Sequence, residues 1–400
     1  MKKQDVQSLL EKDILHFWLS EMTDHERGGF FGRMDGENQL HPDAERGAIL
    51  NARLLWTFSA AYRVLNNKTY LDAAMWAKDY FDQHFLDAQY GGVYWSVDAN
   101  GQPLDTKKQS YAIGFAIYGY SEYARATGDN AALETAISLF HDLENHAFDN
   151  VHNGYIEAFT REWAPIEDMR LSDKDENMSK TMNTHLHILE PYTNLYRALQ
   201  QGGATHSDTL KLVEERLRNL LHLFTHELLN EQTFHLDLFF DNEWNGQRNL
   251  ESFGHDIEAS WLMHETALVI NDAVLLCEIE PYVKRIALAA NEGLNSDGSM
   301  IYERNKTTHH VDRDLHWWVQ CENAVGQYNL YQYFGDREAL QRAEQAYQFI
   351  VDRLVDKRRG EFYWSIKADG TVNHQDDKAG FWKCPYHNGR MCLELIERMR

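Results

Sequence analysis

Three histidines occupy early positions in helical stretches that are otherwise apolar. His187 belongs to a polar stripe along one such stretch, and His255 precedes Glu258 by three residues, so that these two side chains share a helix face. His387 follows Pro385, a residue that suits the first turn of a helix. An imidazole needs little shift to be half neutral near pH 7, so it can accept or donate a proton. These residues indicate general acid–base chemistry.

Other unusual side chains lie at the same early position in their own helices. Arg53 shares an apolar helix face, which is costly for a charge without a partner or a ligand. Trp318 and Glu322 are four residues apart on another helix, and Trp382 lies just before His387. Aromatic faces can cover the C–H faces of a sugar while polar groups bind its hydroxyls. The combination favours a neutral carbohydrate ligand.

The elements that would position these residues follow a six-fold repeat. Short turn-rich segments recur about every 60 to 80 residues, and six units account for nearly the whole chain. Several continue into a turn such as 98–101 and then a second extended stretch, which is typical of a small β-hairpin. The six segments are 28–33, 91–96, 154–159, 233–238, 298–303 and 360–365.

Between the hairpins the apolar spacing is helical, with one stretch before each hairpin and one after it. Because the last helix is not a polar cap, we expect a closed ring rather than an open solenoid. The predicted fold is an all-α (α/α)6 barrel, a single domain over 1–400 with short β-hairpins at one end. The stretches assigned before hairpins are 70–86, 131–146, 210–228 and 337–354, and those after hairpins are 48–65, 111–126, 182–199, 257–270, 317–334 and 385–399.

If the helices after the hairpins form the inner ring and run in one direction, their early turns meet at one mouth. A single histidine near a helix end is usually a satisfied core or capping residue. Packing alone, however, does not require a polar residue at one level in each unit. We therefore expect a common cavity surrounded by Arg53, Tyr111, His187, His255, Glu322 and His387.

Composition narrows the classes of partner. The 400 residues include 62 Asp and Glu against 39 Lys and Arg, a net charge of −23. This excess argues against nucleic acid or an anionic membrane surface, which need clustered basic residues. No apolar run approaches a membrane span and no signal core is seen, so we expect a soluble cytoplasmic protein. Without an exposed apolar stripe, the expected state is a monomer.

Metal and cofactor motifs are missing from the sequence. No H-E-x-x-H or zincin-like ligand spacing occurs, and His185 and His187 point to different helix faces. No Gly-rich phosphate loop or G-x-S-x-G elbow is found either. Four cysteines without paired spacing are expected to be reduced, buried thiols. We expect no metal and no cofactor.

Cofactor-free chemistry on an aldose is open to such a cavity. One histidine can remove the proton α to the carbonyl, leaving an enediolate oxygen that Arg53 can stabilise. A second histidine on the opposite side can return the proton from the other face. This sequence of steps inverts C2.

Four segments also resemble a known family: 51–60, 182–187, 254–261 and 382–390. They are similar to the cellobiose-acting branch of the N-acylglucosamine 2-epimerase superfamily over essentially the full chain. The resemblance implies an (α/α)6 barrel that interconverts the reducing-end glucose and mannose of β-1,4-linked disaccharides such as cellobiose and lactose. It implies His255 and His387 as the acid/base pair, and His187 as a third essential histidine that assists ring opening or the intermediate. The implied substrate-binding residues are Arg53, Tyr111, Asn183, Glu258, Trp318, Glu322 and Trp382.

Alternative functions stay open at this point. An aldose–ketose isomerase or a monosaccharide (mannose or N-acylglucosamine) 2-epimerase would share the enediolate. An inverting glycoside hydrolase would need two carboxylates about 6.5–9.5 Å apart, for which Glu258 and Glu322 are the evident candidates. A non-catalytic sugar-binding module would bind without turnover. Neither the hydrolase nor the binding module explains three histidines in register.

Overall fold

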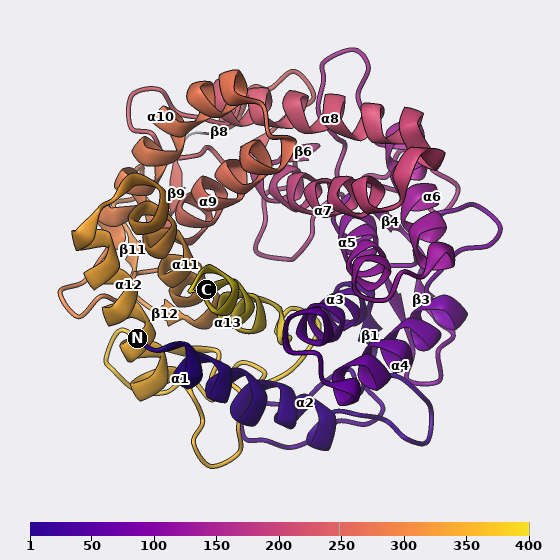
Figure 1. Cartoon of the computed structure of the whole chain (residues 1–400), viewed down its shortest axis with the longest axis horizontal. Coiled ribbons are helices and arrows are strands. Elements are labelled where there is room, and N and C mark those ends of the chain that lie inside the picture. Colours follow the sequence, from indigo (N-terminus) through magenta and orange to yellow (C-terminus); the bar gives the residue numbers. More distant parts are fainter. Residues whose placement is uncertain (248, 400) are drawn as a thin grey trace.

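The chain closes into two concentric rings of helices (Figure 1). The computed structural model describes residues 1–247 and 249–399. Consecutive inner helices pack side by side, and the last also packs against the first, so the inner ring is closed. The inner helices of the described chain are α3 (Ala48–Leu65), α5 (Ser110–Thr127), α7 (Met182–Gln201), α9 (Phe253–Ile270), α11 (Trp317–Phe334) and α13 (Tyr386–Arg398).

The outer ring joins the two ends of the chain. Its first segment comprises α1 (Lys3–Ser8), the π-helical η1 (Leu9–Leu15) and α2 (His16–Glu21), and it packs against α13, the last inner helix. The other outer helices each pack against the inner helix that precedes them. They are α4 (Lys68–His84), α6 (Asn130–His146), α8 (Ser207–His226), α10 (Ala273–Ala290) and α12 (Arg337–Phe349), which continues as η4 (Ile350–Leu354).

The predicted (α/α)6 barrel is confirmed, with local corrections. Helix α9 begins at Phe253 rather than at residue 257, so His255 lies inside its first turn. Short 3₁₀ turns precede α8 (Gly203–His206) and follow α10 (Asn291–Gly293). The four cysteines are free, but Cys277 is exposed on α10, so the expectation of a buried thiol is wrong there. Within the described residues, no helix is both long and apolar enough to span a membrane.

Short strands at the N-terminal ends of the inner helices link each unit to the next. All pairs are antiparallel, and the bridge between Met34 and Ala379 connects the last unit back to the first. The pairs are β1 (Arg46–Gly47) with β2 (Ser96–Val97), β4 (Lys108–Gln109) with β5 (Ala158–Phe159), β6 (Lys180–Thr181) with β7 (Phe239–Phe240), β9 (Leu250–Ser252) with β10 (Glu303–Asn305), and β12 (Leu315–His316) with β13 (Ser365–Ile366).

Each unit contains more β-structure than the single predicted hairpin. Three hairpins add β3 (Pro103–Asp105), β8 (Gly246–Gln247) and β11 (Val311–Asp312) to β2, β7 and β10. A separate bridge closes the turn that follows each outer helix. These bridges are Thr23–Phe30, Leu86–Val93, Phe148–Tyr155, Leu229–Leu236, Leu294–Met300 and Val355–Phe362.

Buried ion pairs tie four of these turns to the start of an inner helix or to the segment before it. An aspartate caps backbone N–H groups of the turn and binds a basic side chain; Asp24, for example, accepts from the N–H groups of Glu26 and Arg27 and from Arg46 Nη2 at 2.5 Å. Removing one partner of a buried pair leaves an uncompensated charge, so each pair holds its turn firmly. The pairs are Arg46–Asp24, Lys108–Asp87, Lys180–Asp149 and Lys378–Asp356.

Replacement of one buried cation tests this role. Arg46→Met leaves the Asp24 carboxylate unpaired in a fully buried setting, and we expect it to lower the free energy of unfolding by about 3–5 kcal/mol. Arg46→Met/Asp24→Asn, which keeps an oxygen for the turn, should recover much of that loss. Urea denaturation measures both.

The matched control is Arg27→Met, because Arg27 pairs with the largely exposed Asp43. Loss of such a surface pair costs roughly 0–1 kcal/mol. Equal losses in Arg46→Met and Arg27→Met would contradict the role given to the buried pairs.

Candidate active site

One position of the inner ring brings charged and imidazole side chains to the same level. Arg53, His187, Glu258 and Glu322 are each the sixth residue of their helix, on α3, α7, α9 and α11. Arg390 is the fifth residue of α13 and reaches the same cluster. Since the inner helices start at one end of the ring, beside the strands, their sixth residues meet on its axis.

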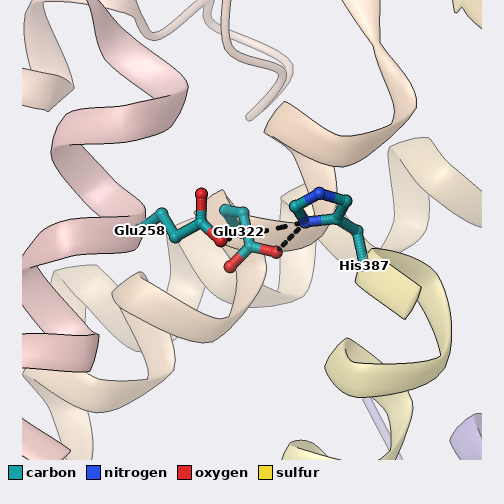
Figure 2. A group of neighbouring side chains, drawn as sticks. All are labelled: Glu258, Glu322 and His387. Atoms are coloured by element: carbon teal, nitrogen blue, oxygen red, sulfur yellow. Dashed lines mark hydrogen bonds and ion pairs between the residues drawn. The ribbon is translucent and has the colours of Figure 1, made fainter. Parts of the chain in front are cut away.

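Two carboxylates lie behind His387. Figure 2 shows Glu258 from α9, Glu322 from α11 and His387 from α13 converging, with the imidazole facing both carboxylates. Glu322 Oε1 lies 2.7 Å from His387 Nδ1, and Glu258 Oε1 lies 3.9 Å from the same atom. A carboxylate at this distance fixes the proton on Nδ1, which leaves Nε2 as the free base.

Arg390 compensates the carboxylates of three different helices. It donates from Nη1 to Glu190 on α7 and from Nη2 to Glu258 at 2.5 Å, and Nη2 lies 2.8 Å from Glu322. It is buried, and its guanidinium lies over the Trp261 and Tyr386 rings. Burial opposes the charge, but the three carboxylates raise the pKa of Arg390 well above its usual value. A permanently charged guanidinium therefore holds this cluster together.

His187 is held in the same manner by Glu190. Its Nδ1 lies 3.2 Å from Glu190 Oε2, and that carboxylate also accepts from the Tyr386 hydroxyl. The backbone at His187 is non-helical because Pro191 has no N–H to bond the His187 carbonyl. The freed carbonyl leans toward α5, where a Cβ at Gly114 would lie only 2.4 Å from it. The kink and the glycine together set the level of this imidazole.

Arg53 is a second buried guanidinium, and it lacks such compensation. It donates to the Tyr111 hydroxyl at 2.8 Å and to the Trp382 carbonyl at 3.4 Å. Its guanidinium lies 4.1 Å from the centre of the Phe115 ring, and its Nε has no acceptor. Among the described residues, no ion pair joins it to a carboxylate. A positive charge thus faces the site without a matching anion.

His255 lies beside a small cavity at the strand end of the ring. Its Nδ1 is 2.8 Å from the Ser252 hydroxyl, so this imidazole has no carboxylate behind it. Asn183, whose buried Oδ1 has no donor, lines the same cavity of about 140 Å³, and the segment 169–178 roofs it. The Trp318 ring lies 4.7 Å from the His255 ring and 5.7 Å from the His387 ring. Two of the predicted histidines therefore flank one indole.

The remaining predicted residues form an aromatic wall. The Tyr111 ring lies 5.0 Å from the His187 ring and 6.1 Å from the Trp382 ring, both edge-on. Burial raises the pKa of Tyr111, so its phenol stays protonated. The structure thus places all ten predicted site residues around one end of the ring.

The three imidazoles are neutral near pH 7. Burial lowers the pKa of His187 to about 4 and that of His255 to about 3. Burial, reinforced by Arg53 and Arg390, also lowers the pKa of His387 well below its ordinary value. Burial and the neighbouring Glu322 raise the pKa of Glu258. The site therefore presents neutral imidazoles that can act as bases.

Glu258, Glu322 and His387 also resemble a metal-ligand set. One potential ligand atom from each lies within 4.8 Å of the others. Arg390, however, already lies against both carboxylates, and a cation between them would face its charge directly. The donor set therefore does not fit a divalent ion.

Sequence reasoning left three residues of this cluster without a role. Arg390 and Tyr386 belong to the 382–390 motif, and Glu190 belongs to the polar stripe of α7. The available signal was spacing, since Arg390 lies three residues after His387 and Glu190 three after His187. Asn194, on the same stripe, lies away from the cluster and donates to Ser121.

Comparisons with known proteins agree along the whole chain. The family model of N-acylglucosamine 2-epimerase (GlcNAc 2-epimerase) matches residues 29–389. A cellobiose 2-epimerase of Bacteroides fragilis is 58% identical, covering 98% of this chain and 98% of that protein. A cellobiose 2-epimerase of Ruminococcus albus is 38% identical over 100% of this chain and 99% of that protein. The structure of cellobiose 2-epimerase from Bacillus thermoamylovorans superposes with a TM-score of 0.92 at 39% identity, covering 99% of each chain.

The role of Arg390 can be tested through the pH dependence of stability. In Arg390→Met the pKa of Glu190, which burial opposes but Arg390 holds below its ordinary value, should rise above the unfolded value of about 4.3. The pKa values of Glu258 and Glu322, which burial already raises, should rise further. The folded state then binds more protons than the unfolded state, and stability falls as pH rises. We expect a loss of about 3–5 kcal/mol at pH 8 that shrinks toward pH 5, measured by urea denaturation.

Arg53→Met is the matched control, because Arg53 is equally buried but pairs with no carboxylate of the described chain. It should show no such downward slope with pH. A loss in Arg390→Met that is independent of pH would contradict the assignment.

Proposed function

The chain belongs to the N-acylglucosamine 2-epimerase family, and from that premise we propose that it is a cellobiose 2-epimerase, an isomerase that acts on a small sugar. The substrate would be the ring-opened aldose at the reducing end of a β-1,4-linked disaccharide. Its glucose and mannose forms would interconvert by inversion at C2. We also propose that residues 1–400 form a single catalytic domain.

The observation that carries this proposal is the uncompensated charge of Arg53. A buried cation without an anionic partner is costly unless the working state supplies the anion. Proton removal from C2 of an open-chain aldose moves an electron pair onto the carbonyl oxygen and creates an enediolate. A preorganised guanidinium in a dry site stabilises such a charge without reorganisation.

Two imidazoles then handle the proton at C2. His255, backed only by a hydroxyl, stays neutral and suits the role of base in one direction. His387 acts as the acid once its Nε2 carries a proton, and Glu322, which holds its Nδ1–H, stabilises that imidazolium. His255 takes the proton from one face of C2, and His387 donates one to the opposite face. After one turnover His255 carries the proton and His387 is neutral. In the reverse reaction His387 is the base and His255 is the acid.

His187 would act on the sugar ring rather than on C2. Glu190 holds its Nδ1, so Nε2 can accept or return the proton of the anomeric hydroxyl during ring opening and closure. The T-shaped contact with Tyr111 places it beside the hydroxyl that binds Arg53. The enediolate oxygen and the opened ring would thus lie on one side of the site.

The arrangement of carboxylates argues against an inverting hydrolase. Such an enzyme needs about 6.5–9.5 Å between its carboxyl groups to admit a water molecule. Here the facing oxygens of Glu258 and Glu322 are within 4.8 Å, with Arg390 bound to both. Neither carboxylate is free to protonate a leaving group or to activate water.

Product analysis in deuterated water tests the reaction. Cellobiose incubated with the enzyme should give glucosyl-mannose labelled at C2, followed by NMR of the sugars. An aldose–ketose isomerase would instead return the proton to C1 and give a ketose as its sole product. Release of free glucose would support hydrolysis, and either result would overturn the proposal.

Single-histidine variants test the two-base scheme. In deuterated water, His255→Asn and His387→Asn should each lose epimerisation by at least about 10²–10⁴-fold. Each variant should still exchange the C2 proton of one epimer only, and the two should differ in which epimer, since one base remains on one face. NMR loss of the C2 proton signal measures this exchange.

The control is His222→Asn, an exposed histidine on α8, which should retain the parent rate. Continued epimerisation in either variant would show that the assigned pair is wrong. A cytoplasmic location and a monomeric state stay predictions.

A further inference from the structure

A second cavity lies at the end of the ring opposite the strands. Its volume is about 430 Å³, within the range of about 300–1,000 Å³ typical of small-molecule sites. The last turns of the inner helices line it, including Arg63 of α3, Arg125 of α5, Tyr333 of α11 and Arg398 of α13. The residues placed in the catalytic cluster do not line this cavity.

The charges around this cavity are balanced. Four arginines and four glutamates line it, and they pair with one another, as Arg125 does with Glu122 at 2.7 Å and Arg197 with Glu265 at 2.7 Å. The carbonyl ends of the inner helices also point to this mouth and carry partial negative charge. A free anion such as phosphate would gain little here. The lining instead offers many donors and acceptors to a neutral molecule.

Two aromatic rings complete the lining of the cavity. The Trp56 and Tyr118 rings lie 4.9 Å apart, tilted by 32°, and form an apolar face. A ligand with an apolar face and several hydroxyl groups would match these rings and the charged side chains around them.

We propose that this cavity is a second binding site for a neutral polyhydroxylated molecule of monosaccharide size. The C–H face of a sugar would lie on Trp56 and Tyr118, and its hydroxyls would exchange hydrogen bonds with the guanidinium and carboxylate groups that line the cavity. Trp56 and Tyr118 also contact the edge of Tyr386, whose hydroxyl donates to Glu190 of the catalytic cluster. A sugar bound in this cavity would therefore contact two rings that pack against Tyr386, and Tyr386 binds the carboxylate that holds His187.

Fluorine NMR of protein labelled with 5-fluorotryptophan tests the site by binding alone, with no turnover required. The probe is methyl β-D-glucopyranoside, which cannot open its ring. The Trp56 resonance is assigned by its loss in Trp56→Phe. We expect it to shift saturably with the probe, and the shift to vanish in Leu268→Phe/Val269→Phe, where larger side chains fill the cavity.

Val274→Phe, on the exposed face of α10, is the matched control and should keep the shift. The resonances of Trp318 and Trp382 report the catalytic end and show that the filled variant is folded. A Trp56 resonance that never moves would overturn the proposal. A Trp56 shift that persists in the filled variant would also overturn it, because the signal would then report the catalytic end.

Discussion

The contact of Arg390 with three carboxylates is the interaction on which the site depends. Glu190, Glu258 and Glu322 come from three inner helices and would repel one another if ionised in a dry interior. One guanidinium from α13 binds all three. The cluster is therefore stable only when the last helix closes the ring. Glu190 and Glu322 in turn hold the Nδ1 atoms of His187 and His387. The orientation of two imidazoles thus depends on a residue that needs no contact with substrate.

The two buried guanidiniums have different roles. One holds neighbouring carboxylates in place, and the other keeps its charge available for the reaction. Arg390 is compensated by several carboxylates, and removing it would leave them unpaired. Arg53 is held by a phenol, a carbonyl and aromatic faces, none of which carries a formal negative charge. Cation–π contacts stabilise its position while leaving its charge available. Similar residue types at one level of the ring therefore serve opposite purposes.

The scaffold explains how different residues reach one level. Strands of one unit pair with the next, and buried cation–aspartate pairs fix the turns to which four of the inner helices connect. Every inner helix then begins at one end of the ring, so a given helix position faces the axis in each unit. The units are free to differ at that position, and they supply Arg53, His187, Glu258 and Glu322 there. Repetition provides the geometry, and divergence within the repeat provides the chemistry.

The sequence by itself determined the ring of helix pairs, the strand end and the level of the histidines, because period, turn residues and helix position are local properties. Bounds such as 48–65 and 317–334 follow directly from apolar spacing. Only the tertiary structure decided which carboxylate serves which base. Glu258 follows His255 by three residues, yet it and Glu322 lie behind His387, and Arg390 rather than Arg53 compensates them. Spacing along one helix indicates a shared face, but pairing across helices depends on the closure of the ring, which brings residues 65 to 200 positions apart into contact.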